Sequence, residues 1–173
     1  MNELIEKAKK FAIAAHDSIN HKRKYTAEPY HIHPERVAKL LTAVTNDPEI
    51  IAAAWLHDVL EDVAPHNASF NDKAILDDFG PKVLQLVLEV TNVTTLADGN
   101  RAKRKSIERE RLATISTEGK LIKLADLIDN IIDISRNDPN FARIFKKEAL
   151  LDLPYLQIDN NPLYEQLSIL LKS

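Results

Sequence analysis

Four polar side chains interrupt the apolar stretch "AAAWLHDVLED", which covers residues 52–62. They are His57, Asp58, Glu61 and Asp62. Burying an imidazole or a carboxylate costs free energy unless the group finds a partner. In an α-helix the first two groups lie one turn from the last two, at i,i+4 spacing, so one helix end presents all four to one region of space. Three carboxylates this close raise one another's pKa, and a divalent cation is the partner that would relieve their repulsion.

Two other segments strengthen the case for a metal site. His33 precedes Pro34 in "PYHIHPERVAKLL", where a helix is expected to begin. Asp126 stands inside the apolar segment "LIKLADLIDN", with Asp129 and Asn130 one turn further along. A carboxylate in the middle of such a helix needs a buried partner, and metal ligation would supply one. A His-Asp pair alone is common, and a helix that ends in "LED" is usually a solvated end, so the metal interpretation depends on these additional segments.

Composition limits what the chain can be. Its 173 residues suffice for one domain with a sizeable core, and the absence of cysteine leaves only nitrogen and oxygen ligands for a metal. The formal net charge of −3 argues against general nucleic-acid binding. The N-terminus lacks the apolar core of a signal peptide, and no apolar stretch is long enough to span a membrane. We therefore expect a soluble cytoplasmic protein.

The elements that position these residues are predicted to be helices. Apolar residues recur at helical spacing along nearly the whole chain, and no long two-residue alternation competes with that pattern. This predicts an all-α fold of about eight or nine helices, in a single domain over residues 1–173. Longer loops are expected at residues 21–33 and 92–101. Four helix starts are indicated by a capping or turn residue before proline, at His33-Pro34, Asp47-Pro48, Asp138-Pro139 and Asn161-Pro162.

The order of the candidate ligands resembles that of a known superfamily. His33, His57-Asp58 and Asp126 follow one another as in the HD-domain metal phosphohydrolases, which are all-α proteins. The flanking segments "RKYTAEPYHIHP", "LHDVLED" and "KLADLIDN" resemble the hydrolase domain of RelA/SpoT enzymes, most of all the free-standing small alarmone hydrolases. The similarity covers roughly residues 8–150 and implies a single HD phosphohydrolase domain.

The resemblance also implies an activity and a set of site residues. The reaction would be hydrolysis of the 3′-pyrophosphate of guanosine tetra- or pentaphosphate (ppGpp or pppGpp) to GDP or GTP and pyrophosphate, with Mn²⁺ as the usual ion and other divalent metals possible. The implied metal ligands are His33, His57, Asp58 and Asp126. The implied catalytic pair, which orients and deprotonates the attacking water, is Glu61 and Asp62. The implied substrate contacts are Arg23, Lys24 and Asn130.

Basic residues concentrate in "HKRKY" and "RAKRKSIERER", which suits a polyanionic nucleotide. We add Arg104, in the second segment, as a candidate phosphate contact. The alternative for that segment is a solvated helix with ion pairs of its own, such as Arg104 with Glu108.

Several questions stay open at this point. Three departures from the family pattern leave the guanine preference undecided: His21 in place of a frequent Gln, Arg111 in place of a frequent His, and Ile132 with Asp133 after the nucleoside-contacting position. The roles of His31 and Arg111, the oligomeric state and a substrate-covering loop at residues 92–101 are also undecided. One alternative function is a phosphatase or nucleotidase that acts on another nucleotide such as NADPH. The other is a catalytically silent module that binds nucleotides.

Overall fold

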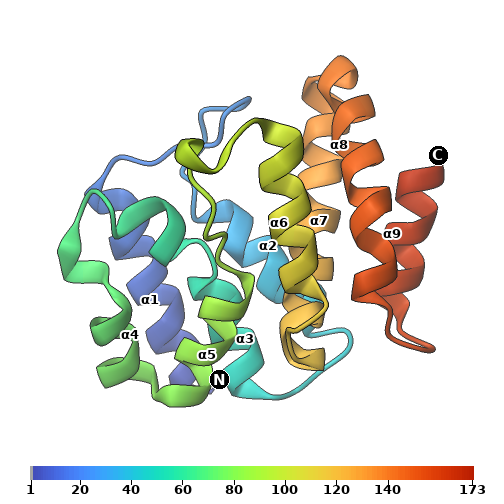
Figure 1. The fold of residues 1–173 in the computed structure, drawn as a ribbon. Coiled ribbons are helices and arrows are strands. Elements are labelled where there is room, and N and C mark those ends of the chain that lie inside the picture. Colours follow the sequence, from blue (N-terminus) through green and yellow to red (C-terminus); the bar gives the residue numbers. More distant parts are fainter. Residues whose placement is uncertain (1) are drawn as a thin grey trace. The chain divides into compact units, whose positions relative to one another are not determined.

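The computed structural model describes residues 2–173, and its fold is drawn in Figure 1. Within this range the chain forms nine α-helices, joined by short 3₁₀ and π segments, without a strand. This confirms the all-α prediction of eight or nine helices. None of the described helices is both long and apolar enough to cross a membrane. The helices are α1 (Glu3–Ser18), α2 (Ile32–Leu41), α3 (Pro48–Leu56), α4 (Asp72–Phe79), α5 (Pro81–Val90), α6 (Arg101–Leu112), α7 (Thr117–Asn137), α8 (Pro139–Asp152) and α9 (Pro162–Lys172).

Three of the four predicted proline starts are confirmed. The side chains of Asp47, Asp138 and Asn161 accept hydrogen bonds from backbone amides at the starts of α3, α8 and α9, and proline occupies the first turn each time. These caps satisfy amides that have no partner within the helix. The fourth start is different: α2 begins at Ile32, so His33 lies inside its first turn rather than before it.

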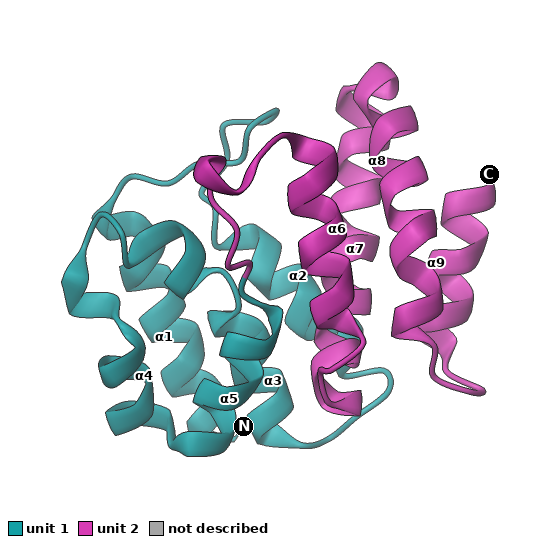
Figure 2. Cartoon of the chain, in the orientation of Figure 1, with its two compact units in different colours: residues 1–91 teal, residues 92–173 magenta. Residues whose placement is uncertain are grey.

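The chain divides into two compact units, which Figure 2 shows in different colours. Unit 1 runs to Thr91, and unit 2 covers Asn92–Ser173. Both units consist of helices around a central one. The expectation of a single domain over residues 1–173 stays a prediction.

In unit 1 the central helix is α3, which contacts α1, α2 and α5. Every residue of α3 from Ile50 to Leu56 is buried. Small side chains dominate where α3 meets its neighbours, because Ala52, Ala53 and Ala54 have no exposed surface, and α1 likewise buries alanines. Alanine at such contacts lets helix axes approach closely. The C-terminal end of α3, which leads into His57, is therefore held by packing on several sides.

In unit 2 the central helix is α7, which packs against α8 and α9. It buries an apolar stripe that includes Ile122, Leu124 and Ile128. The very polar α6 attaches to α8 by charge instead. Arg101 makes a two-pronged ion pair with Glu148, with Nε–Oε1 2.6 Å and Nη2–Oε2 2.8 Å. The basic segment of α6 thus forms ion pairs, as the alternative interpretation held, both with α8 through Arg101 and within α6 between Arg111 and Glu108.

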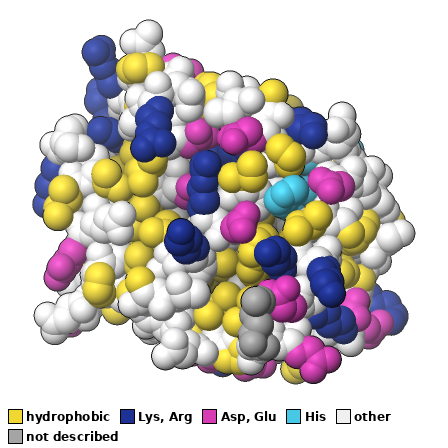
Figure 3. Space-filling model, turned by 180° about the vertical axis from the view of Figure 1, so that it is seen from behind, with side chains coloured by type: hydrophobic (Ala, Val, Ile, Leu, Met, Phe, Trp, Pro, Cys, Tyr) yellow, Lys and Arg dark blue, Asp and Glu magenta, His cyan; other side chains and the backbone are white. Residues whose placement is uncertain are grey.

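Surface charges of both signs lie side by side on the face drawn in Figure 3, where Lys and Arg side chains are interspersed with Asp and Glu. The chain has 23 Lys and Arg against 26 Asp and Glu, so its slight excess is acidic.

Candidate metal centre

The residues after α3 do not continue as an α-helix, which differs from the sequence expectation. His57 is the C-terminal cap of α3, and the chain then forms a π-helical turn, η1 (Val59–Val63). Its i→i+5 bond runs from Ala64 N to Val59 O at 3.0 Å. Asp62 N still donates to Asp58 O at 2.9 Å, so the acidic pair follows the His-Asp pair by one turn. Single π turns in helical segments are frequent at functional sites.

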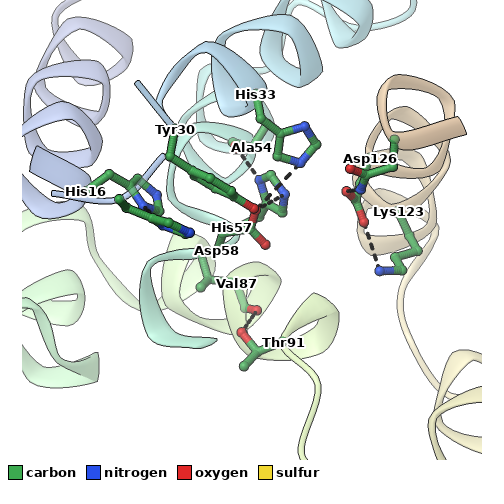
Figure 4. Close-up of polar contacts among 12 residues, drawn as sticks. His16, Tyr30, His33, Ala54, His57, Asp58, Val87, Thr91, Lys123 and Asp126 are labelled. Carbon is green, nitrogen blue, oxygen red and sulfur yellow. Dashed lines mark hydrogen bonds and ion pairs between the residues drawn. The ribbon is translucent and has the colours of Figure 1, made fainter. Parts of the chain in front are cut away.

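Three of the predicted ligands meet in unit 1, and Figure 4 shows them converging. One ligand atom each from His33, His57 and Asp58 lies within 4.8 Å of the others. Asp58 Oδ2 is 3.1 Å from His57 Nε2 and 3.5 Å from His33 Nε2. Both imidazoles are almost fully buried, whereas Asp58 is partly exposed. The cluster therefore offers two nitrogens and an oxygen to one cation, with access from solvent on the carboxylate side.

A backbone contact fixes the tautomer of His57. Its Nδ1 lies 2.8 Å from the carbonyl oxygen of Ala54, which can only accept a hydrogen bond. Nδ1 must therefore carry a proton, and Nε2, which faces Asp58, is the ring nitrogen that can bind a metal ion. A histidine that donates through one ring nitrogen to a carbonyl and presents the other is arranged as metal-binding histidines usually are. The donor chemistry of the cluster thus fits a divalent metal ion.

Asp62, one of the two predicted catalytic acids, has a strongly perturbed pKa. Burial, the largest cause, and the nearby charges of Asp58 and Glu61 together raise the pKa of Asp62 from 3.8 to about 7, against the opposite effect of His57 and a hydrogen bond from Tyr30. The metal-free protein therefore holds a carboxyl group beside the cluster that titrates near neutral pH. Such a group suits proton transfer at neutral pH.

Tyr30 is the residue at this site whose part sequence analysis missed. Its hydroxyl donates to Asp58 Oδ2 at 2.7 Å, as Figure 4 shows. The Pro-Tyr pair before the first ligand histidine was the available signal, but a tyrosine there is equally consistent with simple packing.

The two predicted basic contacts of unit 1 lie in different environments. Arg23 is buried, and its guanidinium carbon lies 5.6 Å from the centroid of the Tyr30 ring. The Tyr30 ring links Arg23 to the cluster of predicted ligands, because the Tyr30 hydroxyl donates to Asp58. Lys24 is exposed, and its ammonium group lies 4.9 Å from the ring of Tyr25. Their contact with substrate stays a prediction.

The fourth predicted ligand, Asp126, lies in unit 2 on α7, where neighbours on its own helix surround it. Lys123 Nζ donates to its Oδ2 at 2.9 Å, and Asn130 Nδ2 donates to its Oδ1 at 2.6 Å. The carboxylate is buried, and Figure 4 shows the contact with Lys123. Asp126 thus has protein partners already, so its burial alone does not require a metal. Asn130, predicted to contact the nucleoside, holds this carboxylate.

Arg104 and the loop before α6 are also tied together within unit 2. Arg104 Nη1 donates to the carbonyl oxygen of Gly99 at 2.7 Å. The Glu108 carboxylate accepts from the amides of Val93 and Thr94, at 2.8 and 2.7 Å. The loop at residues 92–101, whose part in covering substrate is undecided from the sequence, is therefore fastened to α6 at both ends.

Four residues have no role assigned from the sequence: His21, His31, Arg111 and Asp133. His21 stacks on Tyr30, and Arg111 pairs with Glu108 at 2.8 Å. Asp133 accepts from Asn137 within α7, and His31 stands at the N-terminal cap position of α2, where its side chain makes no capping hydrogen bond. His21 is thereby connected to the cluster, because the Tyr30 hydroxyl donates to Asp58.

Comparison with known proteins gives a family. The model of the HD domain matches residues 8–151. Over 113 residues the chain is 42% identical to a protein of Drosophila melanogaster named guanosine-3′,5′-bis(diphosphate) 3′-pyrophosphohydrolase MESH1, covering 64% of this chain and 59% of that one. It is 33% identical over 138 residues to the Xenopus tropicalis protein of the same name, covering 79% and 72%.

One solved structure has a similar fold along nearly the whole length of this chain. It is described as "A metazoan ortholog of SpoT hydrolyzes ppGpp and plays a role in starvation responses", with a TM-score of 0.85 and 28% identity, covering 99% of this chain and 96% of that one. The matched region spans only 59% of the Drosophila relative and 21% of a Mycoplasma genitalium relative. On the family match, the fold and the buried His-His-Asp cluster together, the chain belongs to the HD domain family.

Proposed function

We propose that this protein is a Mn²⁺-dependent pyrophosphohydrolase that removes the 3′-pyrophosphate from ppGpp and pppGpp. The products would be GDP or GTP and pyrophosphate. The observation that carries the proposal is the buried cluster of His33, His57 and Asp58, followed one turn later by two further carboxylates. The names of the Drosophila and Xenopus relatives supply the reaction.

The metal would be held by His33, His57 and Asp58 of unit 1, with Asp126 of unit 2 as the fourth ligand. Two imidazoles and two carboxylates suit Mn²⁺, Fe²⁺ or Zn²⁺, and four protein ligands leave about two positions open on a roughly octahedral ion. Lys123 and Asn130 each occupy one lone pair of the Asp126 carboxylate, and its remaining lone pairs are available to the cation. Mn²⁺ is our choice among these ions because the family resemblance implies it.

The chemistry divides between the ion and the acidic pair. A bound divalent ion lowers the pKa of its water and holds a phosphate oxygen. Asp62 would accept the proton of the attacking water, for which a carboxylate with a pKa raised by burial is suited. Glu61, the neighbouring carboxylate, would orient that water. Arg23, Lys24, Asn130 and Arg104 are the proposed substrate contacts, and the buried guanidinium of Arg23 is suited to clamp phosphate oxygens in a fork.

The proposed division of roles can be tested with two pairs of variants. His57→Ala and Asp58→Ala should lose bound Mn²⁺ together with turnover of ppGpp. Glu61→Gln and Asp62→Asn should keep most of the Mn²⁺ and lose turnover. Metal content is measured by atomic emission after gel filtration, and turnover by pyrophosphate release. Equal metal loss in both pairs would contradict the division of roles.

The alternative functions give different results in the same assay. A phosphatase that acts on NADPH would release orthophosphate from NADPH and leave ppGpp intact. A silent module would bind ppGpp without turnover, but the perturbed Asp62 beside the cluster favours an enzyme. Because the net charge is −3, we also propose that the protein does not bind nucleic acid. We propose that it acts on free nucleotides in the cytoplasm.

A further inference from the structure

We propose that Tyr30 is a positioning residue of the metal centre. Its hydroxyl would hold the carboxylate of Asp58 in the orientation that binds the ion, and His21 and His16 would hold the Tyr30 ring in place. This inference rests on the metal site of the proposed function, and it assigns a task to residues outside the proposed ligand and catalytic sets.

The hydroxyl acts at the point where the ligand atoms converge. Tyr30 Oη donates to Asp58 Oδ2 at 2.7 Å, and the same oxygen faces the Nε2 atoms of His33 and His57. A carboxylate on a short side chain can rotate, and this hydrogen bond selects one rotation of it. Partners that hydrogen-bond to metal ligands in this way orient them and adjust their basicity. Tyr30 thus stands to Asp58 as the Ala54 carbonyl stands to His57.

The Tyr30 ring is itself held on more than one side. His21 lies parallel to it, with ring centroids 3.7 Å apart and an interplanar angle of 7°. Tyr30 N also donates to His21 O at 3.1 Å, so backbone and side chain are both paired. The wholly buried His16 of α1 contacts the Tyr30 ring and approaches His21, with Nδ1 atoms 3.1 Å apart. Figure 4 shows His16, Tyr30 and Asp58 in this order.

The stack gives His21 a structural reason for its place. An imidazole can lie flat on a phenol ring and still direct a ring nitrogen toward His16, because its donors and acceptors lie in the ring plane. A Gln side chain could keep a polar contact with His16 but has no ring to stack. Removing the His21 ring should therefore loosen the Tyr30 side chain but leave the Tyr30 hydroxyl present. Removing the hydroxyl should leave the stack in place.

The test compares variants that separate these two contributions. Tyr30→Phe keeps the ring and deletes the hydroxyl, and His21→Gln keeps a polar group and deletes the stack. Mn²⁺ affinity of the full chain is measured by titration with electron paramagnetic resonance of the free ion, which also records the line shape of the bound ion. We expect the Kd of Tyr30→Phe to rise about tenfold, the lower end of the usual effect of losing such a partner. His21→Gln should raise it by a smaller factor.

Two controls and the thermal midpoint keep the outcomes separate. Tyr155→Phe makes the same change at an exposed position and should leave the Kd unchanged. Asp58→Ala should abolish binding. Without metal, the variants should unfold at temperatures close to that of the wild type. A folding defect in Tyr30→Phe would instead lower the unfolding temperature before metal is added.

The proposal is overturned if Tyr30→Phe binds Mn²⁺ as tightly as the wild type. It is also overturned if the variant binds more tightly, since the hydroxyl would then compete with the ion for Asp58. In both cases Mn²⁺ binding by the wild type and its loss in Asp58→Ala would leave the proposed function standing. A wild-type protein that binds no Mn²⁺ would overturn the proposed function and this inference together.

Discussion

Asp62→Asn in the metal-free protein is expected to raise stability at alkaline pH. The folded-state pKa of Asp62 is raised to about 7, whereas the unfolded chain titrates near 3.8. Below pH 3.8 the group is protonated in both states and contributes nothing. As the pH rises toward 7, the unfolded chain releases its proton first, so the folded state loses stability. Asparagine has no charge to bury, so the variant avoids this loss.

The size of the effect follows from these two pKa values. The linkage relation between about 7 and 3.8 gives a destabilisation of about 2 kcal/mol at pH 5 and about 4 kcal/mol at pH 8. Solvent reaches the partly exposed carboxylate and screens its charge. We therefore expect the advantage of the variant over the wild type to grow by about 1 to 3 kcal/mol between pH 5 and pH 8.

The assay is urea unfolding of both proteins in EDTA at pH 5 and pH 8, followed by circular dichroism. Asp159→Asn, at an exposed position, is the matched control and should show no such growth. Saturating Mn²⁺ at pH 8 should shrink the advantage of Asp62→Asn, because the cation compensates the carboxylates in the wild type. An advantage that stays constant or falls with rising pH would refute the reasoning.

Three further predictions concern unit 2. Asp152→Ala should cost about 1 to 3 kcal/mol, because it leaves the mostly buried Arg109 without its 2.8 Å partner, and urea unfolding measures this loss. Glu108→Ala should speed hydrogen exchange of the amides at residues 93–94, because these amides donate to the Glu108 carboxylate. Unchanged exchange rates would show that these hydrogen bonds do not hold the loop. Gly99→Ala should cost about 1 to 2 kcal/mol, because φ is +118° there, and an unchanged melting temperature would contradict that strain.

The sequence was most informative where the signal is local. Asp47 and Asp138 before proline predicted helix starts because capping depends on neighbouring residues alone. The π turn after Leu56 could not be predicted, since an apolar periodicity does not distinguish i+4 from i+5 hydrogen bonds over five residues. The attachment of α6 to α8 through Arg101 was equally hidden, because ion pairs between distant helices leave no periodic pattern.

In the candidate site, too, contacts between residues close in the chain were easier to predict than contacts between distant residues. His57 and Asp58 are adjacent in the chain, so their proximity was evident, and the approach of His33 follows from the fold of unit 1. The local partners of Asp126 were within reach, since Lys123 precedes it by three residues and such pairs meet on a helix. The hydroxyl of Tyr30 on Asp58 joins residues 28 positions apart and was not predicted. That Asp126 joins the three ligands of unit 1 stays a prediction.

We propose above all that this chain releases pyrophosphate from the 3′ position of ppGpp. The most direct measurement is incubation of the purified protein with Mn²⁺ and ppGpp, with the products separated by anion-exchange chromatography. We predict GDP and pyrophosphate in equal amounts, and neither product in EDTA or with Asp62→Asn. Release of orthophosphate, or intact ppGpp in the presence of Mn²⁺, would contradict the account.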